Sequence, residues 1–311
     1  MCADRKKISV NICICTCSRE ELLFECLQSL DTALVPDDIS VSVSVIDNAP
    51  DQGAKQVVER YNRSGMFEVA YRVEERRGIP FARNRAIACT EALNSDYLIF
   101  IDDDEWVTPE WLGAMFRLSR QKGGDAVISG AVRSIIPKEV PGHISYFFTR
   151  EKGGRTGDKL QACATNNVLI PMQVITRHGL RFDEANPLAG GTDTIFFVQA
   201  VAFGVEIYKC MEAVVYERVP LARANLRWLS KRKYRVGVTE AWRKLHKGRS
   251  RVEIFLSSTT SLLAQFAICV LAVAAHQKRQ RNKAWLRVSK SAGVVMGLFG
   301  RQVDSYRDIE K

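Results

Sequence analysis

The chain has 311 residues, of which 46% are hydrophobic and 26% charged, values that fit a folded protein with a large core and exclude a disordered chain. Its net charge of +10 is unevenly distributed. Residues 1–217 contain 24 Lys and Arg against 30 Asp and Glu, whereas residues 218–311 contain 21 against 5. We therefore expect an acidic soluble body and a basic end that attracts a polyanion, either nucleic acid or an anionic membrane surface.

Strand and helix patterns alternate along the first 132 residues. Strands are predicted at 8–15, 41–47, 67–73, 97–101 and 126–132, and helices at 19–30, 51–61, 81–93 and 109–120. This alternation predicts an α/β fold with a mostly parallel central sheet and helices on both faces. Residues 137–159 are expected to form a long loop, followed by a strand at 164–170 and a helix at 193–203.

The nine cysteines are an odd number and include no Cys-x-x-Cys pair. Zinc ligands usually have a different spacing, so these residues are interpreted as small buried hydrophobic side chains in a reducing cytoplasm. The N-terminus leads into a polar-interrupted strand rather than an apolar signal region, which favours a catalytic part that stays in the cytoplasm.

Four consecutive acids, Asp102, Asp103, Asp104 and Glu105, directly follow the apolar strand 97–101. Crowded carboxylates repel one another unless a cation holds them together, and such oxygen ligands suit Mg²⁺ or Mn²⁺ carrying a phosphate. The simpler alternative is a solvated acidic turn before a helix that starts near Thr108 and Pro109.

Three of the notable positions, around Thr16, Asp47 and Asp102, all fall where a predicted strand ends. The carboxyl ends of parallel strands meet at one edge of a sheet, and open α/β sheets bind nucleotides there. This placement favours the metal and phosphate interpretation over the acidic turn.

Short motifs occur in a fixed order on these elements. They are Ile12–Arg19, Val45–Asn48, Gly78–Asn84, Phe100–Asp104, Phe182–Glu184, Gly190–Asp193 and Arg227–Trp228. In this order they resemble the family-2 glycosyltransferases with the GT-A fold, particularly bacterial enzymes of exopolysaccharide assembly. The resemblance extends from residue 8 to about residue 240.

The resemblance implies a UDP-sugar donor held by several of these motifs. Asp104 would bind a divalent cation that bridges the two phosphates, and Asp102 would contact the ribose or a metal-bound water. The residues implied to bind the donor are Thr16, Arg19, Asp47 (at the uracil or ribose), Arg83 (at the diphosphate or the acidic loop), Asp102 and Asp103. Alternatives stay open for some of them: Thr16 and Arg19 are equally typical of a helix cap, and Arg83 of a surface helix start.

On the acceptor side, Asp193 is the candidate general base that removes a proton from the attacking hydroxyl. Its alternative role is an acidic residue that stabilises a helix N-terminus. The family usually has glutamate where this chain has Thr192, and its processive members have glutamine where this chain has Ala224, so we expect transfer of one sugar per encounter. Further acceptor or loop candidates are Asp183, Glu184, Arg227 and Trp228.

Residues 254–275 form a stretch of 22 residues without a charge, long enough as a helix to span a bilayer. Serine and threonine dilute its first half, and Lys and Arg flank both ends, so an in-plane or re-entrant helix with both ends cytoplasmic is preferred. Residues 293–299 are a second candidate for shallow contact. The alternative is a buried core helix of a soluble protein.

Together these features predict a catalytic domain at 1–240, with a nucleotide half at about 1–132 and an acceptor half at 133–240, and a membrane-associating tail at 241–311. The predicted activity is inverting transfer of a hexose, with glucose as the first choice, from a UDP-sugar to a lipid-linked saccharide. The predicted location is the cytoplasmic face of the bacterial inner membrane, with no nucleic-acid partner. The alternatives are a sugar-nucleotide nucleotidyltransferase, although residues 11–20 contain no glycine for its phosphate loop, and a nucleic-acid-binding protein.

Overall fold

The computed structural model describes residues 7–149, 154–185, 187–188, 191–246 and 248–301. By the contacts among its residues, the chain divides into two compact units. The first unit comprises Met1–Arg133, Glu151–Pro187 and Thr192–Arg218, and the second comprises Ser134–Arg150, Leu188–Gly191 and Val219–Lys311. Each unit is described by itself below. The predicted domain boundary at residue 240 falls inside a helix, α8 (Leu226–His246), and that domain assignment remains a prediction.

The first unit contains a sheet whose first part is parallel. Its elements in chain order are β1 (Ile8–Thr16), α1 (Glu20–Leu30), β2 (Ile39–Asp47), α2 (Ala54–Tyr61), β3 (Val69–Val73), α3 (Ile79–Ala92) and β4 (Tyr97–Asp102). Because a helix connects each strand to the next, the strands pair in parallel in the spatial order β3-β2-β1-β4. The predicted α/β class is confirmed, and the predicted parallel pairing is found in this half of the sheet.

The sheet continues beyond β4 with antiparallel strands, which the alternating pattern did not indicate. The later elements are β5 (Glu105–Val107), α4 (Trp111–Gln121), β6 (Val127–Ile135), β7 (Lys159–Leu160), β8 (Val168–Pro171), α6 (Met172–His178), α7 (Thr192–Ala202) and β9 (Ile207–Arg218). The full order is β3-β2-β1-β4-β8-β6-β9-β5, with β7 beside β9. The pairs β4–β8, β6–β8, β5–β9 and β7–β9 are antiparallel.

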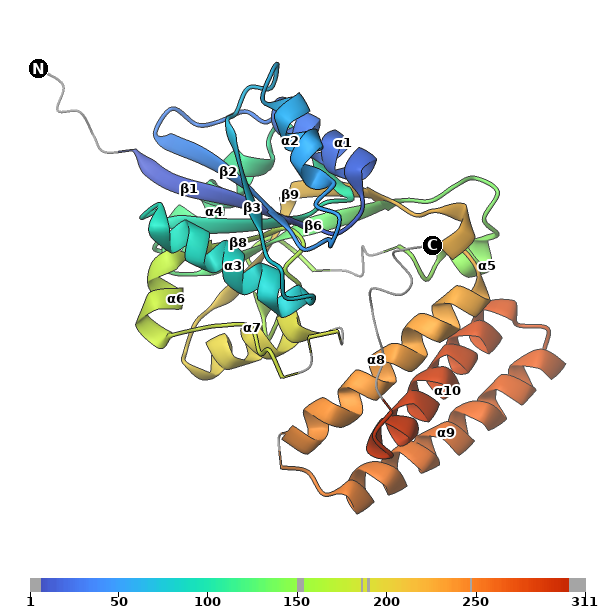
Figure 1. Ribbon diagram of the computed structural model, residues 1–311. Coiled ribbons are helices and arrows are strands. Elements are labelled where there is room, and N and C mark those ends of the chain that lie inside the picture. Colours follow the sequence, from blue (N-terminus) through green and yellow to red (C-terminus); the bar gives the residue numbers. More distant parts are fainter. Residues whose placement is uncertain (1–6, 150–153, 186, 189–190, 247, 302–311) are drawn as a thin grey trace, which may run out of the picture. The chain divides into compact units, whose positions relative to one another are not determined.

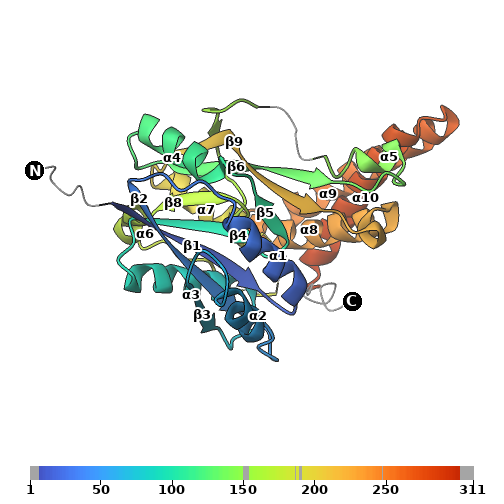
Figure 2. The same ribbon diagram turned by 90° about the horizontal axis from the view of Figure 1, so that it is seen from above.

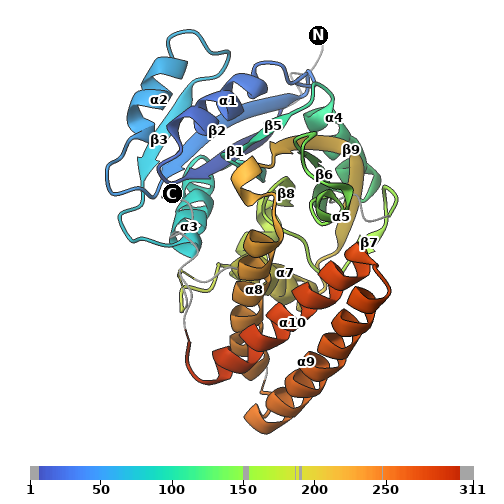
Figure 3. The same ribbon diagram turned by 90° about the vertical axis from the view of Figure 1, so that its right-hand side faces the viewer.

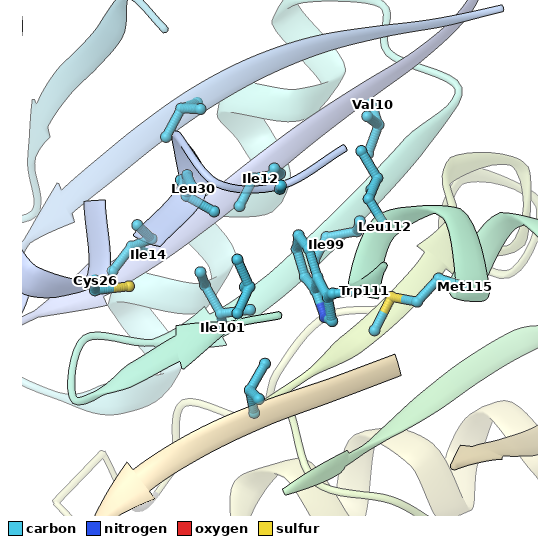
Figure 4. Close-up of a cluster of buried hydrophobic side chains, with 14 of the residues drawn as sticks. Val10, Ile12, Ile14, Cys26, Leu30, Ile99, Ile101, Trp111, Leu112 and Met115 are labelled. Atoms are coloured by element: carbon cyan, nitrogen blue, oxygen red, sulfur yellow. The ribbon is translucent and has the colours of Figure 1, made fainter. Parts of the chain in front are cut away.

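Helices cover both faces of this sheet (Figures 1 and 2). Side chains of α1, α2 and α4 pack on one face in a cluster with alternate residues of β1 and β4, whereas α3, α6 and α7 pack on the other. Figure 4 shows the first cluster, in which Ile12, Ile99 and Trp111 lie between the strands and the helices. Successive side chains of a strand point to opposite faces of the sheet, and the strands are apolar on both, so each face needs a layer of helices to bury it.

Some predicted elements differ from the observed ones. The expected loop at 137–159 contains a short helix, α5 (Gly142–Ser145), and ends in β7. The helix expected from Pro109 begins at Trp111, because β5 follows the acidic turn first. The strand expected at 164–170 begins only at Val168, and the twelve-residue β9 was not predicted because charged residues interrupt its alternation.

The second unit contains α5 and a layer of three long helices, α8 (Leu226–His246), α9 (Arg251–Ala274) and α10 (Lys278–Leu298) (Figures 1 and 3). Close contact between α8 and α10 depends on glycine. A Cβ atom on Gly237 would lie 2.0 Å from the Lys290 carbonyl oxygen, and one on Gly293 would lie 2.1 Å from the Tyr234 carbonyl oxygen. Only residues without side chains allow these backbones to approach so closely.

Candidate active site

The ends of β1, β2 and β4 bring the predicted nucleotide residues to one edge of the sheet. In the register of the strands, Thr16 pairs with Asp47, and Cys15 pairs with Asp102. Thr16, Asp47 and Asp102 therefore lie at the ends of the adjacent strands β1, β2 and β4, where the sequence analysis expected them.

The four acids at the end of β4 separate into two kinds. Asp103 and Glu105 are buried, with 4% and 1% of their surface exposed, whereas Asp102 and Asp104 are half-buried. Asp102 and Asp104 are therefore the two acids of this turn that keep part of their surface accessible. The sequence predicted this pair for the cation and the ribose.

Asp103 is held by Thr16, the last residue of β1, and by Arg19, three residues further on. Its Oδ2 accepts a hydrogen bond from Thr16 Oγ1 at 2.7 Å, and its Oδ1 accepts one from Arg19 Nη1 at 2.8 Å. The same Arg19 nitrogen lies 3.1 Å from Asp104 Oδ2. Burial raises the pKa of Asp103, and the charge of Arg19 opposes that rise. These three candidate donor residues therefore contact one another and fix the acidic turn to the end of β1.

Glu105 and Asn166 are site residues that the sequence analysis did not single out. Glu105 accepts hydrogen bonds from Asn166 Nδ2 at 2.8 Å and from the backbone N–H of Asp102 at 3.2 Å. Burial, aided by the charge of Asp102, holds the pKa of Glu105 well above the usual value of 4.5. The position of Glu105 in the run of four acids was the only sequence signal for it. Its side chain points inward because Glu105 begins β5, a strand that was not predicted.

Arg83, on α3, contacts the start of α7. Its Nη1 lies 3.3 Å from Thr192 Oγ1, and its guanidinium carbon lies 5.5 Å from the centre of the Phe182 ring. Burial raises the pKa of the Cys15 thiol to about 12; the charge of Arg83 opposes that rise, and the charges of Asp102 and Asp103 add to it.

Asp193 is the second residue of α7, beside the residue that Arg83 contacts. Its Oδ1 accepts a hydrogen bond from the backbone N–H of Thr194 at 3.0 Å, and the side chain is half-buried. Asp193 lies in the first turn of α7, where a carboxylate stabilises the helix through its dipole, and its role as base remains a prediction. Gly190, the first residue of this motif, lies outside the described residues.

Asp47 is the most enclosed of the predicted donor residues. It is fully buried, and its oxygens accept hydrogen bonds from Ala49 N–H at 2.9 Å, Ala54 N–H at 3.2 Å and the Tyr71 hydroxyl at 2.9 Å. Burial raises the pKa of Asp47. A base or ribose bound through Asp47 would have to share oxygens that already accept three bonds, a constraint that its position at the strand end did not indicate.

Asn48 holds the loop between β3 and α3 in place. The Asn48 amide donates to the Glu74 and Arg76 carbonyl oxygens at 2.7 and 2.9 Å and accepts from Gly78 N–H at 2.9 Å. Gly78 adopts a φ of 153° and a Cβ atom there would lie 2.6 Å from Pro187 Cβ, so this turn requires glycine.

The acceptor candidates Asp183 and Glu184 lie against α3. Asn84 donates to Glu184 Oε1 at 2.8 Å, and Arg76 lies 3.3 Å from Glu184 Oε2. Asp183 Oδ1 accepts from Ala185 N–H at 2.8 Å. Glu184 therefore has two polar partners that hold its segment, whereas Asp183 closes a local turn.

Arg227 and Trp228 belong to the second unit and begin α8. The Trp228 ring stacks on Phe148 with 6.0 Å between ring centres, and the Arg232 guanidinium carbon lies 5.4 Å from the Trp228 ring centre. Arg227 is exposed. The ring contacts of Trp228 are thus with residues of the second unit.

The residues present fit a cation that is shared with a substrate. No group of three or more His, Cys, Asp and Glu side chains suited to a metal ion occurs among the residues that the structure describes. Mg²⁺ in nucleotide sites is typically bound by one or two carboxylates, with phosphate oxygens and waters completing the octahedron. Asp102 and Asp104, both half-buried at the end of β4, are two such carboxylates.

Solved structures with a similar fold identify the class of protein. The structure of S. aureus TarS 1-349 in complex with UDP aligns with a TM-score of 0.54 over 97% of this chain and 92% of that one, at 15% identity. GalNAc-T7 with UDP, GalNAc and Mn²⁺ aligns with a TM-score of 0.56 over 76% of this chain and 51% of that one, at 14% identity. These likenesses confirm the predicted GT-A fold.

Sequence comparison then identifies the family. The family described as "Glycosyl transferase family 2" matches residues 11–179. The chain is 31% identical to the succinoglycan biosynthesis protein ExoM of Rhizobium meliloti (strain 1021) over 315 aligned residues, which cover 96% of each chain. The chain belongs to glycosyltransferase family 2. This membership favours the glycosyltransferase hypothesis over the nucleotidyltransferase and nucleic-acid-binding alternatives.

Proposed function

We propose that the protein is an inverting, metal-dependent hexosyltransferase of exopolysaccharide or surface-polysaccharide biosynthesis. Its donor is a UDP-sugar, with glucose as the first choice of sugar, and its acceptor is a lipid-linked saccharide. The observation that carries the proposal is the acidic turn at the end of β4, where Thr16 and Arg19 hold Asp103 and leave Asp102 and Asp104 half-buried at the carboxyl edge of the parallel strands. The UDP bound in the TarS structure supports a UDP-sugar donor. The similarity to ExoM, a succinoglycan biosynthesis protein, supports a role in polysaccharide biosynthesis.

The acidic turn is the proposed donor site. Asp104 and Asp102 hold Mg²⁺ or Mn²⁺, which when bound neutralises charge on the diphosphate as UDP leaves. Asp103, Thr16 and Arg19 hold that turn in place through their mutual hydrogen bonds. Arg19 also keeps one oxygen of Asp104 oriented, so the other oxygen remains for the cation.

Asp193 is the proposed general base. The acceptor hydroxyl oxygen attacks the anomeric carbon, the bond from that carbon to the UDP oxygen breaks, and the hydroxyl proton passes to the Asp193 carboxylate. A single displacement of this kind inverts the configuration at the anomeric carbon. Its helix-start bond to Thr194 fixes the carboxylate and does not remove its ability to take a proton.

The proposed location is the cytoplasmic face of the inner membrane. The basic residues after position 217 attract an anionic surface, and α9 is the one helix of the described residues that is long and apolar enough to cross a membrane. A lipid-linked acceptor would be available at that face.

The proposed reaction is tested by measuring UDP, GDP and dTDP release from the corresponding sugar nucleotides, with a membrane lipid extract as acceptor. We expect UDP release that depends on the lipid extract and gives a glycosylated lipid. Release from GDP- or dTDP-sugars alone would overturn the donor assignment, and lipid-independent release would overturn the acceptor assignment.

The metal site is tested by calorimetry of UDP binding with Mn²⁺ and with EDTA. We expect Asp104→Ala to lose the metal-dependent part of the affinity. Asp37→Ala is the matched control, because Asp37 is an exposed carboxylate just before the opposite end of β2. Equal affinity of the parent protein with and without EDTA would contradict the metal role.

A further inference from the structure

The outward face of α9 carries large apolar side chains at both ends and through its second half, with serine and threonine between Leu256 and Leu263. Nine of the twenty large hydrophobic side chains that are exposed among the described residues lie on this one helix of 24 residues. Six of them, at spacings of three, four and seven residues, form a single strip: Val252, Leu256, Leu263, Phe266, Val270 and Val273. An exposed apolar strip of this length is unusual on a protein that only water covers.

The opposite face of α9, which packs on α10, is more polar than the outward one. Ser261 Oγ lies 3.3 Å from Ser291 Oγ, and Arg287 donates to Gln265 Oε1 at 3.4 Å. Further along, Cys269 Sγ lies 3.7 Å from the Arg281 carbonyl oxygen. Ile254 and Ala272 also pack inward, but most of the large apolar side chains of α9 are exposed, unlike those of a surface helix of a water-soluble protein.

These contacts also give the register of α9 and α10, which run antiparallel along their full lengths. Arg287 of α10 donates to Gln265, near the middle of α9, rather than lying beyond its ends. If α9 crossed a bilayer in this pairing, the Arg287 cation would enter the hydrocarbon, at an unfavourable factor of about 10² at the centre. The packing therefore disfavours a spanning orientation that length and composition alone allow.

We infer that α9 lies in the plane of one membrane leaflet, with its outward strip in the acyl region and α10 on the water side. The occupant of this surface is an anionic lipid leaflet, because the charges around the strip are mostly basic: Arg249 and Arg251 precede the helix or begin it, and Lys278, Arg279 and Lys283 follow it, against the single acid Glu253, which pairs with Arg249. The inference deepens the proposed function, since it rests on the proposed location at a membrane and specifies how the protein is held there.

Vesicle flotation of the full-length protein tests the surface directly. We expect binding to vesicles of phosphatidylglycerol and phosphatidylcholine at 30:70, and much weaker binding to phosphatidylcholine alone. The double variant Leu263→Glu/Phe266→Glu should lower the partition coefficient about 100-fold, because each large side chain removed from the acyl region costs about tenfold. The uncharged variant Leu263→Gln/Phe266→Gln should show an intermediate loss, which separates lost burial from charge repulsion.

The matched control is Leu34→Glu/Leu93→Glu in the first unit, where both side chains are exposed at 63% and 50%, comparable to 62% for Leu263 and 52% for Phe266. We expect this control to bind vesicles within about twofold of the parent. Equal losses in both double variants would overturn the assignment to α9. A parent that forms a dimer through this face and ignores vesicles would also overturn it, in favour of a second copy of the chain as occupant.

Fusions to the two ends of the full chain distinguish an in-plane or re-entrant α9 from one that crosses the membrane once. We expect green fluorescent protein to be fluorescent, and alkaline phosphatase to be inactive, at both the N-terminus and the C-terminus, because both ends stay cytoplasmic. An active C-terminal phosphatase with an inactive N-terminal one would overturn the in-plane orientation.

Calorimetric UDP binding, measured without lipid, separates this inference from the proposed function. The α9 variants should bind UDP as the parent does. A parent that floats with anionic vesicles but binds no UDP would contradict the proposed function alone, whereas one that binds UDP and does not float would contradict the α9 inference alone.

Discussion

In the first unit, large apolar side chains such as Leu27 and Trp111 lie between the sheet and its helices with no exposed surface, whereas in the second unit α9 exposes its apolar face and buries Ser258. Both regions draw on similar residue types, so composition does not distinguish them. The difference lies in what covers each face: protein in the first unit, and, by our inference, lipid in the second. The pattern of apolar residues therefore predicts that a face will be buried. The tertiary contacts then indicate whether protein or another partner covers that face.

The largest expected effect separates chemistry from attachment. Asp193→Asn keeps the side-chain oxygen that accepts from Thr194 but cannot take a proton, so transfer should fall by about 10²- to 10⁴-fold. Binding of the UDP-sugar and of vesicles should remain unchanged, as measured by calorimetry and flotation.

Thr192→Ala is the control for Asp193→Asn, because it removes a neighbouring polar side chain without removing a carboxylate. It should lower the rate far less. Transfer by Asp193→Asn within a few-fold of the parent would place the base elsewhere, with Glu184 and then Asp183 as the next candidates.

Truncation of a leucine to alanine should lower the free energy of unfolding strongly on the buried face of the first unit and very little on the exposed face of α9. Leu27→Ala removes a fully buried side chain of the first unit and should lower the free energy of unfolding by about 2–5 kcal/mol. Leu263→Ala removes a side chain that is 62% exposed and should change it by less than about 0.5 kcal/mol. Urea unfolding without lipid measures both values, and a comparable cost for Leu263→Ala would mean that protein covers the α9 face.

The three-helix layer should be intolerant of added atoms at its glycine contacts. Gly293→Ala would place Cβ 2.1 Å from the Tyr234 carbonyl oxygen, so the helices must separate, at a cost of about 1–3 kcal/mol. Gly113→Ala, on α4 of the first unit, meets no atom closer than 3.5 Å and should be neutral or stabilising by up to about 1 kcal/mol. Thermal unfolding of the two variants tests this contrast, which fails if Gly293→Ala unfolds at the parent temperature.

The smallest effect concerns the ionic contact between α8 and α10. Hydrogen bonds from Lys290 and Lys244, at 2.6 and 2.9 Å, lower the pKa of Glu240 although burial opposes this. A lowered folded-state pKa contributes stability above the usual glutamate value of 4.5, and this contribution is lost as the pH falls through the folded value.

Glu240→Gln should therefore be less stable than the parent by about 1 kcal/mol at pH 7, and the difference should disappear in acid. Denaturation at a series of pH values between 7 and 3 measures it. A difference that is independent of pH would show that packing, rather than the ion pairs, accounts for the role of Glu240.

Much of the first unit could be predicted from local pattern. The strands that end at Thr16, Asp47 and Asp102 were located within about two residues, since apolar runs bounded by turn residues carry a strong signal. The antiparallel strands were harder, because β5 has three residues and β9 carries charges that disturb its alternation. Their pairing partners are distant in sequence, and no local pattern specifies them.

The sequence by itself determined the α/β class, the order of the family motifs and the uncharged helix in a basic region, because each depends on residues close together in the chain. Only the tertiary structure decided which acids of the turn face inward, that Thr16 and Arg19 bond to Asp103, and that Asp47 is enclosed by three donors. It also decided that α9 turns its polar side to α10. The physical reason is the same in each case: the direction of a side chain is set by the partner that packs against it, and those partners come from distant parts of the sequence.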